Sequence, residues 1–516
     1  MTPGRPSATG DASPVADESG LPARAPALLV RGGFVYTVDD EERIHPSGSV
    51  LVVGDRIAAV GDDASVRRAV GELEPALREG LQTLDAQGMM VLPGFVNPHW
   101  HENFSMRLVA PNGALRPTHD HGDRPGLFAR GGDVAELSRE FDRRYAIADS
   151  LLPDEAEAIA RYSLWTQLRS GTTTFGDVGS VNRPEALVAA TRALGLRGAI
   201  SLWASDAECV PGEGRHRRTR DADAVLARVE ALLQSCADDR SGRVRAMPSV
   251  IYPPNMTDAL GVGLAELVGR YDTPFATHIA ALRNEAEIME ACFGASSIRR
   301  FSELGLLTER LLAVHCAFAD DAERALLLDA GVHINHSPAK YGTAGERTLS
   351  DSKLIVELLR AGLDVSLSTD GETLPLGGMA EAMRQAWQAH NEIWADNTAV
   401  RPTTALAMAT RVAARGLRWD AEVGSLEVGK QADLVLVPVD DWRYLLRARP
   451  LEGFLMLGGS ADVRTVIVAG RVLLQDGRAT FVDERDLERR YVEALTSFSR
   501  RAFGIADDVL ERIAAA

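Results

Sequence analysis

Along the middle of the chain, short apolar runs alternate with longer amphipathic stretches such as DEAEAIARYSLWTQLRSG and LIVELLRAG. This alternation is typical of parallel strands joined by crossover helices. Eight runs can be counted, and eight βα units close a barrel whose strand carboxyl ends share one mouth. The runs are GFVNPHWH, TTTFGDVG, LRGAISLWASD, VRAMPSVIYPP, FATHIAA, LLAVHCAF, VHINHSPAKY and LDVSLSTDGE.

The two ends of the chain carry a different pattern, with short β-branched runs bounded by Gly or Asp. ALLVRGGFVYTVD and GSVLVVGDRIAAVGD stand near the start, and ADLVLVPVD and VRTVIVAGRVLLQDGRAT near the end. We therefore predict an α/β fold, a (β/α)8 TIM barrel over residues 93–415. A composite β-sandwich is expected from 26–92 and 416–480, with a disordered leader over 1–25 and terminal helices over 481–516.

Composition narrows the possible partners. The 516 residues are 45% hydrophobic, enough for a large core, and the formal charge is -17. Nucleic acid and anionic lipid both need a surplus of Lys and Arg, so neither is an expected partner. The four cysteines are widely separated, a spacing that does not suggest a disulfide framework, and the sequence contains no apolar run long enough to predict a membrane span. We predict a cytoplasmic protein.

Metal-compatible side chains stand at the ends of several predicted strands. His99 and His101 are two apart, which puts both imidazoles on one face of a strand. His278, His315 and Asp370 end the fifth, sixth and eighth runs. Barrel strands deliver such residues to one mouth, and imidazole with carboxylate suits zinc or ferrous iron. The pattern therefore predicts a metal site.

Several motifs occur in an order that resembles the amidohydrolase superfamily. They are VLPGFVNPHWH, LLAVHC, VHINHSPAK, STDG and GSLEVGKQADLVLV, and the resemblance as a whole covers residues 27–479. The chain is most similar to the branch that holds S-adenosylhomocysteine and guanine deaminases, cytosine deaminase and the triazine chlorohydrolases. Strand four, RVRAMPSVIYPP, lacks the lysine that carries a second metal in other branches. The resemblance therefore implies one divalent metal, Zn²⁺ in most members and Fe²⁺ in some.

The resemblance also assigns roles to residues. It implies that His99, His101, His278 and Asp370 bind the metal, that His315 contacts the bound water or the substrate, and that His336 lies near the substrate. A homodimer is the common assembly. Asp370 and His315 are then the catalytic pair, because a carboxylate beside the metal can move the water proton and an imidazole can donate to the new oxygen. The expected reaction is hydrolysis of a C–N bond other than a peptide bond, as in deamination of an amino-substituted nitrogen heterocycle.

One position departs from the deaminase pattern. The strand-five histidine begins an HxxE motif in that branch, whose glutamate protonates the ring nitrogen, but here the motif reads HIAA and the position is Ala281. Glu102, Glu285 and Glu372 are candidates to replace this acid, although a surface carboxylate is the commoner role of each. Alternatively the substrate does not need ring protonation, as with a chloride or another exocyclic leaving group or a cyclic amide. The remaining alternative is that the protein descends from an enzyme, has lost hydrolysis and only binds a ligand.

Other residues carry weaker expectations. Trp100 alternates with the two histidines, so we expect it to pack in the core. Asp177 ends the second run and is either a support for the site or a helix cap. The segment 110–152 is long and polar, so we expect a loop that covers the site. His119 and His121 in this loop are not assigned to the metal.

Overall fold

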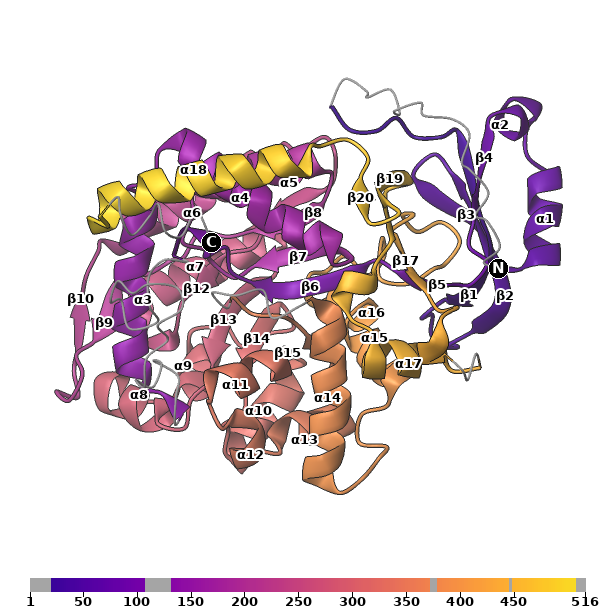
Figure 1. Cartoon of the computed structure of the whole chain (residues 1–516). Helices are drawn as coiled ribbons and strands as arrows, with labels where there is room; N and C mark the ends of the chain where they lie inside the picture. Colours follow the sequence, from indigo (N-terminus) through magenta and orange to yellow (C-terminus); the bar gives the residue numbers. More distant parts are fainter. Residues whose placement is uncertain (1–19, 107–130, 372–377, 445–447, 507–516) are drawn as a thin grey trace.

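The computed structural model describes residues 20–106, 131–371, 378–444 and 448–506. Within these ranges, two parallel sheets and one mixed sheet form the frame of the molecule, and helices cover the parallel sheets (Figure 1). A short hairpin, β9 (Ala207–Cys209) with β10 (His216–Arg218), forms a further two-stranded sheet.

The eight predicted apolar runs all form strands. The first parallel sheet has the order β11-β8-β7-β6 and the second β12-β13-β14-β15-β16. The run VRAMPSVIYPP is split around Met247 and Pro248, because proline has no N–H to donate to a ladder. The bounds are β6 (Phe95–Trp100), β7 (Thr172–Asp177), β8 (Arg197–Ile200), β11 (Val244–Ala246), β12 (Ser249–Val250), β13 (Phe275–Ile279), β14 (Leu311–His315), β15 (His333–His336) and β16 (Val365–Leu367).

The two parallel sheets meet at both of their edges. At one edge a single bridge joins Trp203 to Ser249, and at the other the Asn97 side chain bonds to Thr369. Asn97 Nδ2 lies 2.8 Å from Thr369 Oγ1, and Thr369 N lies 3.2 Å from Asn97 Oδ1. Between the described residues of β16 and β6 no strand ladder is formed. The fold is thus α/β and of the TIM-barrel type, as predicted, and the ring of strand pairing is not continuous.

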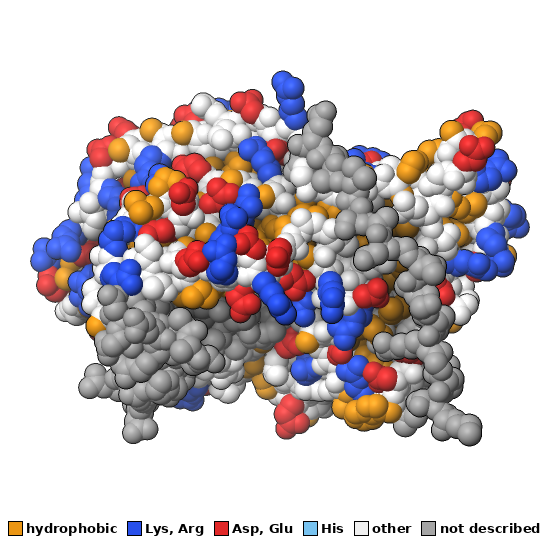
Figure 2. All heavy atoms as spheres, turned by 45° about the horizontal axis from the view of Figure 1, so that its top comes forward, with side chains coloured by type: hydrophobic (Ala, Val, Ile, Leu, Met, Phe, Trp, Pro, Cys, Tyr) orange, Lys and Arg blue, Asp and Glu red, His pale blue; other side chains and the backbone are white. Residues whose placement is uncertain are grey.

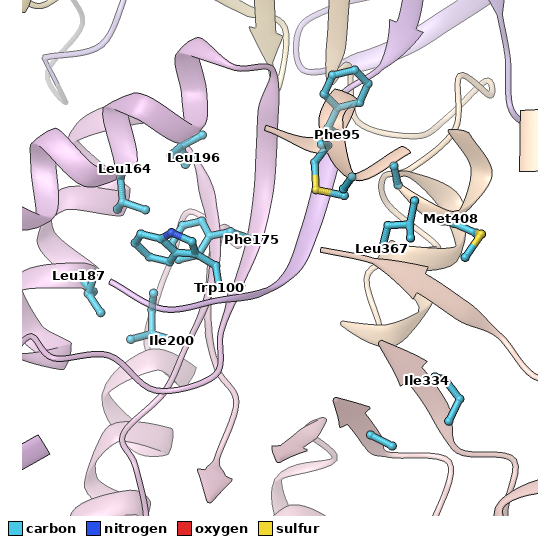
Figure 3. Close-up of a cluster of buried hydrophobic side chains, with 14 of the residues drawn as sticks. Phe95, Trp100, Leu164, Phe175, Leu187, Leu196, Ile200, Ile334, Leu367 and Met408 are labelled. Carbon is cyan, nitrogen blue, oxygen red and sulfur yellow. The ribbon is translucent and has the colours of Figure 1, made fainter. Parts of the chain in front are cut away.

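Helices pack on the outer face of these strands. Trp100 is buried there with Phe175, Leu164 and Leu187, between the strands and helices α4 and α5 (Figure 3). The predicted packing role of Trp100 is confirmed. The helices are α3 (Val134–Ala148), α4 (Pro153–Arg169), α5 (Pro184–Leu194), α6 (Ala222–Ala237), α7 (Asp258–Tyr271), α8 (Glu285–Phe293), α9 (Ser297–Glu303), α10 (Asp321–Ala330), α11 (Pro338–Ala344), α12 (Thr348–Asp351), α13 (Leu354–Arg360), α14 (Met379–Trp394), α15 (Pro402–Met408) and α16 (Arg411–Gly416).

Local sequence explains where these helices begin and end. In α10, Asp320 accepts a hydrogen bond from the backbone N–H of Glu323 and Glu323 accepts one from Asp320, which satisfies two amides that a helix start leaves open. Gly331 ends the same helix at φ 61°, a left-handed conformation that glycine adopts without steric cost.

Strands from both ends of the chain form one nine-stranded sheet. Its order is β20-β19-β18-β17-β5-β1-β2-β3, and β4 pairs with β1. The predicted sandwich and the domain limits at 26–92 and 416–480 stay predictions. The bounds are β1 (Ala27–Tyr36), β2 (Ile44–Val53), β3 (Arg56–Asp62), β4 (Leu81–Asp85), β5 (Met89–Pro93), β17 (Leu434–Pro438), β18 (Thr465–Val468), β19 (Arg471–Gln475) and β20 (Arg478–Ala479), with α1 (Asp63–Gly71), α2 (Pro75–Glu79) and α17 (Pro450–Leu457) beside them.

A buried ion pair connects this sheet to the parallel strands. Arg197 at the start of β8 donates from Nε and Nη2 to the two carboxylate oxygens of Asp433, at 3.0 and 3.1 Å. Gln431 accepts a third bond from Arg197, and the backbone N–H of Ala469 donates to Asp433. Both charges are fully buried and hydrogen-bonded, which is the condition under which a buried pair is tolerated.

Two expectations about flexible segments need correction, whereas the terminal segment is helical where the structure describes it. Residues 131–152 of the predicted covering loop contain helix α3, and 107–130, with His119 and His121, lie outside the described residues. The predicted leader is ordered from residue 20, because Leu21 is buried and Arg24 donates to the carbonyl of Ala469. The terminal segment forms one described helix, α18 (Glu484–Phe503), which lies along α4.

The surface over α18 carries both signs of charge. Figure 2 shows Lys and Arg side chains interspersed with Asp and Glu on this face, and Arg489 and Arg490 of α18 pair with Asp486.

None of the helices in the described ranges has the length and apolarity to cross a bilayer.

Candidate functional site

Three histidines converge at the carboxyl ends of the parallel strands. His99 and His101 lie at the end of β6 and His278 near the end of β13, and all three are buried. The Nε2 atoms of His99 and His101 are 2.9 Å apart, and those of His101 and His278 are 3.1 Å apart. Each histidine offers one ring nitrogen, and these three nitrogens all lie within 4.8 Å of one another. The three side chains can therefore hold one metal ion together.

Asp370 and His315 complete the cluster. Asp370 Oδ1 lies 3.7 Å from His99 Nε2 and 3.6 Å from His101 Nε2. On its other side, Asp370 Oδ2 lies 3.4 Å from His315 Nε2. The structure thus brings together all five residues that the sequence placed at strand ends. Below, these five are called the histidine cluster.

Hydrogen bonds to the far ring nitrogens orient the three converging histidines. His101 Nδ1 lies against the carbonyl of Gly179, and His278 Nδ1 lies 2.5 Å from the carbonyl of Ile251. A carbonyl only accepts, so each Nδ1 carries the hydrogen and each Nε2 of a neutral ring presents a lone pair. The lone pairs therefore point at one another.

His99 is oriented through a chain of hydroxyl groups. Its Nδ1 lies 3.4 Å from Ser368 Oγ, and Ser368 uses its own hydrogen in a 2.6 Å bond to Asn335 Oδ1. Asn335 in turn donates from Nδ2 to Ser366 Oγ at 3.0 Å. Because the Ser368 hydrogen is committed, its oxygen accepts from His99 Nδ1, and the Nε2 lone pair of His99 joins the other two.

This arrangement fits a cation. Lone pairs about 3 Å apart repel unless a positive charge lies between them. Three imidazoles and a carboxylate match the donor set of zinc and of other borderline divalent ions. The converging lone pairs and the donor set thus agree on a divalent metal.

The electrostatic environment favours the protonation states that a metal needs. Burial holds the pKa of His99 well below its usual value, and it lowers the pKa of His278 to about 3. Burial by itself would raise the pKa of Asp370, but the nearby Lys340 ammonium holds it well below its usual range. Neutral imidazoles and a charged carboxylate at neutral pH are the ligand forms that bind cations.

Left-handed backbone places two members of the cluster. His315 has φ 68° and Asp370 has φ 58°, values that non-glycine residues rarely adopt. In β14, Leu312 and Val314 pack in the interior cluster, whereas Leu311 and Ala313 face the helices. Regular alternation would send His315 outward with the latter two, so the left-handed turn brings it to the site. Such strained positions are characteristic of functional sites.

Asp177 supports the histidine cluster through Gly179. Its Oδ1 accepts the backbone N–H of Gly179 at 2.9 Å and the hydroxyl of Ser180 at 2.7 Å. Gly179 has φ 95°, and a Cβ there would lie 1.9 Å from the Trp203 ring, so only glycine fits. The Gly179 carbonyl contacts His101, and Asp177 therefore holds the group that orients this ring. Of the two roles expected for Asp177, a support for the site and a helix cap, these contacts favour the first.

Two of the three candidate acids serve local structure. Glu285 accepts from the backbone N–H groups of Ala280 at 2.7 Å and Ala281 at 2.8 Å, and from the Ser297 hydroxyl at 2.6 Å. Its pKa is raised by burial to about 6, yet its oxygens are occupied by these donors. Glu102 accepts from the backbone N–H of Phe104 and from the Asn182 amide. Glu372 lies outside the described residues.

His336 lies beside the cluster but makes a different contact. Its Nε2 is 2.8 Å from Nε2 of His390 in α14, and its ring packs at 5.3 Å from the Tyr341 ring. No contact between His336 and the metal-facing atoms is formed among the described residues, and its substrate role stays a prediction.

Lys340, Tyr341 and Glu346 are site residues that sequence reasoning did not single out. Lys340 Nζ lies 3.5 Å from Asp370 Oδ2 and forms a buried ion pair with Glu346. Tyr341 OH lies 2.9 Å from His315 Nδ1. The only signal was the position of Lys340 and Tyr341 in VHINHSPAKY, directly after a strand that ends at the site.

Fold and cluster together define a class of protein, the metal-dependent hydrolases of the TIM-barrel type. The model of the Amidohydrolase family matches residues 90–473, and the chain belongs to this family. The predicted class, a hydrolytic enzyme that acts on C–N bonds, is thereby confirmed.

Named relatives cover almost the whole chain. The 5-methylthioadenosine/S-adenosylhomocysteine deaminase of Syntrophobacter fumaroxidans is 27% identical over 483 residues, which are 91% of this chain and 98% of that protein. The enzyme of the same name from Desulforudis audaxviator is 29% identical over 470 residues, 90% of this chain and 97% of the other. The 5'-deoxyadenosine deaminase of Methanosarcina mazei is 26% identical over 474 residues, 89% of this chain and 95% of that protein.

Solved structures show the same fold. The atrazine chlorohydrolase TrzN from Arthrobacter aurescens TC1, in complex with zinc, superposes with a TM-score of 0.74 at 25% identity over 91% of this chain and 100% of the other. An adenosine deaminase from Xanthomonas campestris with bound zinc reaches a TM-score of 0.75 at 23% identity over 93% of this chain and 99% of the other.

Proposed function

We propose that this chain deaminates an amino-substituted nitrogen heterocycle by hydrolysis, with a single zinc ion held by His99, His101, His278 and Asp370. The observation that carries this proposal is the set of three buried imidazole lone pairs directed at one point beside a buried carboxylate. The deaminase names of the relatives and the zinc in two structural neighbours support the reaction class and the metal.

The contacts within the histidine cluster suggest which residue performs each step of the reaction. When bound, a divalent cation supplies Lewis acidity that makes water acidic enough to act as a nucleophile near neutral pH. Asp370 accepts the proton of the attacking water and delivers a proton to the departing amino nitrogen. The C–O bond forms, the C–N bond breaks, and the products are the oxo-heterocycle and ammonia. His315 donates to the new oxygen.

The substrate class we propose is an adenine-type nucleoside. The three relatives named above are deaminases of 5-methylthioadenosine, S-adenosylhomocysteine or 5'-deoxyadenosine by name. Ala281 distinguishes this chain from the HxxE pattern, and the nearby Glu285 is engaged by backbone donors. A heterocycle with a better leaving group, such as chloride, needs less help at the ring nitrogen and is the second candidate, favoured by Ala281 and by the chlorohydrolase neighbour.

Architecture and assembly complete the proposal. We propose that the two parallel sheets are halves of a (β/α)8 barrel and that the nine-stranded sheet folds over as a β-sandwich subdomain, as the TIM-barrel type of the neighbours suggests. A homodimer in the cytoplasm is the expected form.

An ammonia-release assay tests the reaction. Zinc-loaded protein is incubated with 5-methylthioadenosine, S-adenosylhomocysteine, 5'-deoxyadenosine, guanine and a chlorotriazine, and ammonia and chloride are both measured. Ammonia equal to the substrate consumed supports deamination, and chloride release supports the second candidate. Protein with stoichiometric zinc that consumes none of these substrates would count against both. The His278→Ala variant controls for contaminating deaminase.

A further inference from the structure

The neighbour of His315 Nδ1 differs in kind from the neighbours of His101 and His278. His315 Nδ1 lies 2.9 Å from Tyr341 OH, whereas the Nδ1 atoms of His101 and His278 face carbonyl oxygens. A hydroxyl can donate as well as accept, so this contact can put the hydrogen of the imidazole on either nitrogen. The surroundings of the hydroxyl decide between the two forms.

The Tyr341 hydroxyl already accepts one hydrogen bond. The backbone N–H of Ser337 donates to Tyr341 OH at 3.3 Å, and an N–H cannot accept. Among the described residues, His315 Nδ1 is the one acceptor within hydrogen-bond distance of this hydroxyl. Tyr341 is fully buried, so a hydroxyl hydrogen without an acceptor would be costly. Donation from Tyr341 to His315 Nδ1 avoids this cost.

The other side of the ring favours the same tautomer. His315 Nε2 lies 3.4 Å from Asp370 Oδ2, and Lys340 Nζ lies 3.5 Å from the same oxygen. A charged carboxylate oxygen next to an Nε2 lone pair would be repulsive, whereas it attracts an Nε2–H. The Tyr341 hydroxyl and the Asp370 carboxylate therefore both favour the tautomer of His315 with a hydrogen on Nε2 and none on Nδ1.

We propose that Tyr341 is a positioning residue that fixes His315 in the tautomer with its hydrogen on Nε2. His315 then presents a hydrogen-bond donor to the centre at which the three other histidines present lone pairs. In the reaction this donor faces the oxygen that the attack creates, a place where an imidazole lone pair would repel it. The donor matters more in this chain because Ala281 supplies no acid. This role in turnover rests on the proposed function, but the tautomer itself does not.

Nitrogen NMR of the full-length zinc-loaded protein tests the tautomer directly. With ¹⁵N-labelled histidine, the His315 ring is assigned from the signals that disappear in His315→Gln. We expect wild-type His315 to show an unprotonated Nδ1 and a protonated Nε2, with the reverse pattern for His101 and His278. A protonated Nδ1 on wild-type His315 would overturn the proposal whether or not a substrate is known.

Tyr341→Phe removes only the hydroxyl. We expect zinc content to stay at the wild-type level, the His315 signals to shift toward a mixture of tautomers, and kcat to fall by roughly 10–100-fold with KM changed far less. Tyr444→Phe is the matched control, because the Tyr444 hydroxyl is buried without a hydrogen-bond partner among the described residues. This control should retain the His315 signals and kcat.

Each remaining outcome decides the question. Loss of zinc in Tyr341→Phe would mean that the hydroxyl maintains the fold of the site, and an unchanged His315 tautomer would mean that Asp370 alone sets it. Either result overturns the role assigned to Tyr341. A wild-type protein with the expected tautomer that turns over no heterocycle would refute the proposed function and leave this inference standing.

Discussion

Two groups of buried histidines lie close together in this protein and solve the same electrostatic problem differently. In the histidine cluster, the far nitrogens of His101 and His278 are hydrogen-bonded to carbonyls, so the near nitrogens face each other as acceptors. In the pair of His336 and His390, the two Nε2 atoms lie 2.8 Å apart and His336 Nδ1 has no partner in the described part of the chain.

The difference lies in the hydrogens. The His336–His390 pair can place a hydrogen on one Nε2 and a lone pair on the other, so it forms an ordinary hydrogen bond. The histidine cluster cannot do this without breaking its bonds to the carbonyls, and a cation is the remaining way to satisfy it. Proximity of imidazoles therefore does not define a metal site, whereas the partners of their far nitrogens do.

The largest effect should come from removing one imidazole from each group. His278→Ala should abolish stoichiometric zinc binding and reduce turnover by more than the roughly 10–100-fold that loss of an outer hydrogen-bond partner costs. His336→Ala should keep its zinc. Metal analysis of both purified variants is the measurement, and equal zinc content in the two would remove the distinction between the groups.

Zinc should stabilise the folded protein only through the histidine cluster. At free zinc about 1,000 times Kd, the free energy of unfolding should rise by about 4 kcal/mol relative to chelated protein. His390→Leu should show the same increment and His278→Ala should show none. Urea unfolding with and without chelator gives these values, and a zinc effect of equal size in His278→Ala would contradict the assignment.

The His336–His390 pair should make the free energy of unfolding depend on pH. Burial lowers the pKa of His390 from 6.5 to about 4 in the folded protein. As the pH falls below 6.5, His390 becomes protonated in the unfolded chain but stays neutral in the folded protein. The contribution of His390 to the free energy of unfolding is therefore complete above pH 6.5 and is lost as the pH falls toward 4.

The size of this loss can be measured by difference. Between about pH 7 and about pH 5, His390 should account for about 2 kcal/mol of the fall in unfolding free energy. Urea unfolding of chelated wild type and of His390→Leu at both pH values isolates the contribution. The same pH slope in the two proteins would show that His390 is not held neutral.

The smallest effect should come from breaking the pair at neutral pH. His390→Leu leaves His336 Nε2 buried without its partner, which should cost about 1–2 kcal/mol. Replacing both residues, in His336→Phe with His390→Leu, removes donor and acceptor together and should recover part of this cost. A double-mutant cycle of unfolding free energies at neutral pH makes the comparison, and additive losses would argue against a hydrogen bond.

Some predictions from the sequence failed for identifiable reasons. Glu285 was a candidate acid because it follows Ala281 closely, but proximity along the chain does not show that backbone N–H groups already occupy its oxygens. The loop predicted over 110–152 contains α3, which begins at the N-cap residue Asp133 and buries Val134 and Leu137 on one face. Leu21 was assigned to a leader, yet it packs in the core against distant residues.

The amino-acid sequence by itself determined the strands, their order and the residues that end them. Short apolar runs that alternate with amphipathic stretches form parallel strands, and parallel strands deliver His99, His101, His278 and Asp370 to the same end. Only the tertiary structure decided which nitrogen of each imidazole faces the centre, that a left-handed turn brings His315 inward, and that Lys340 and Tyr341 meet it there. These outcomes depend on hydrogen-bond partners far apart along the chain, which no local pattern encodes.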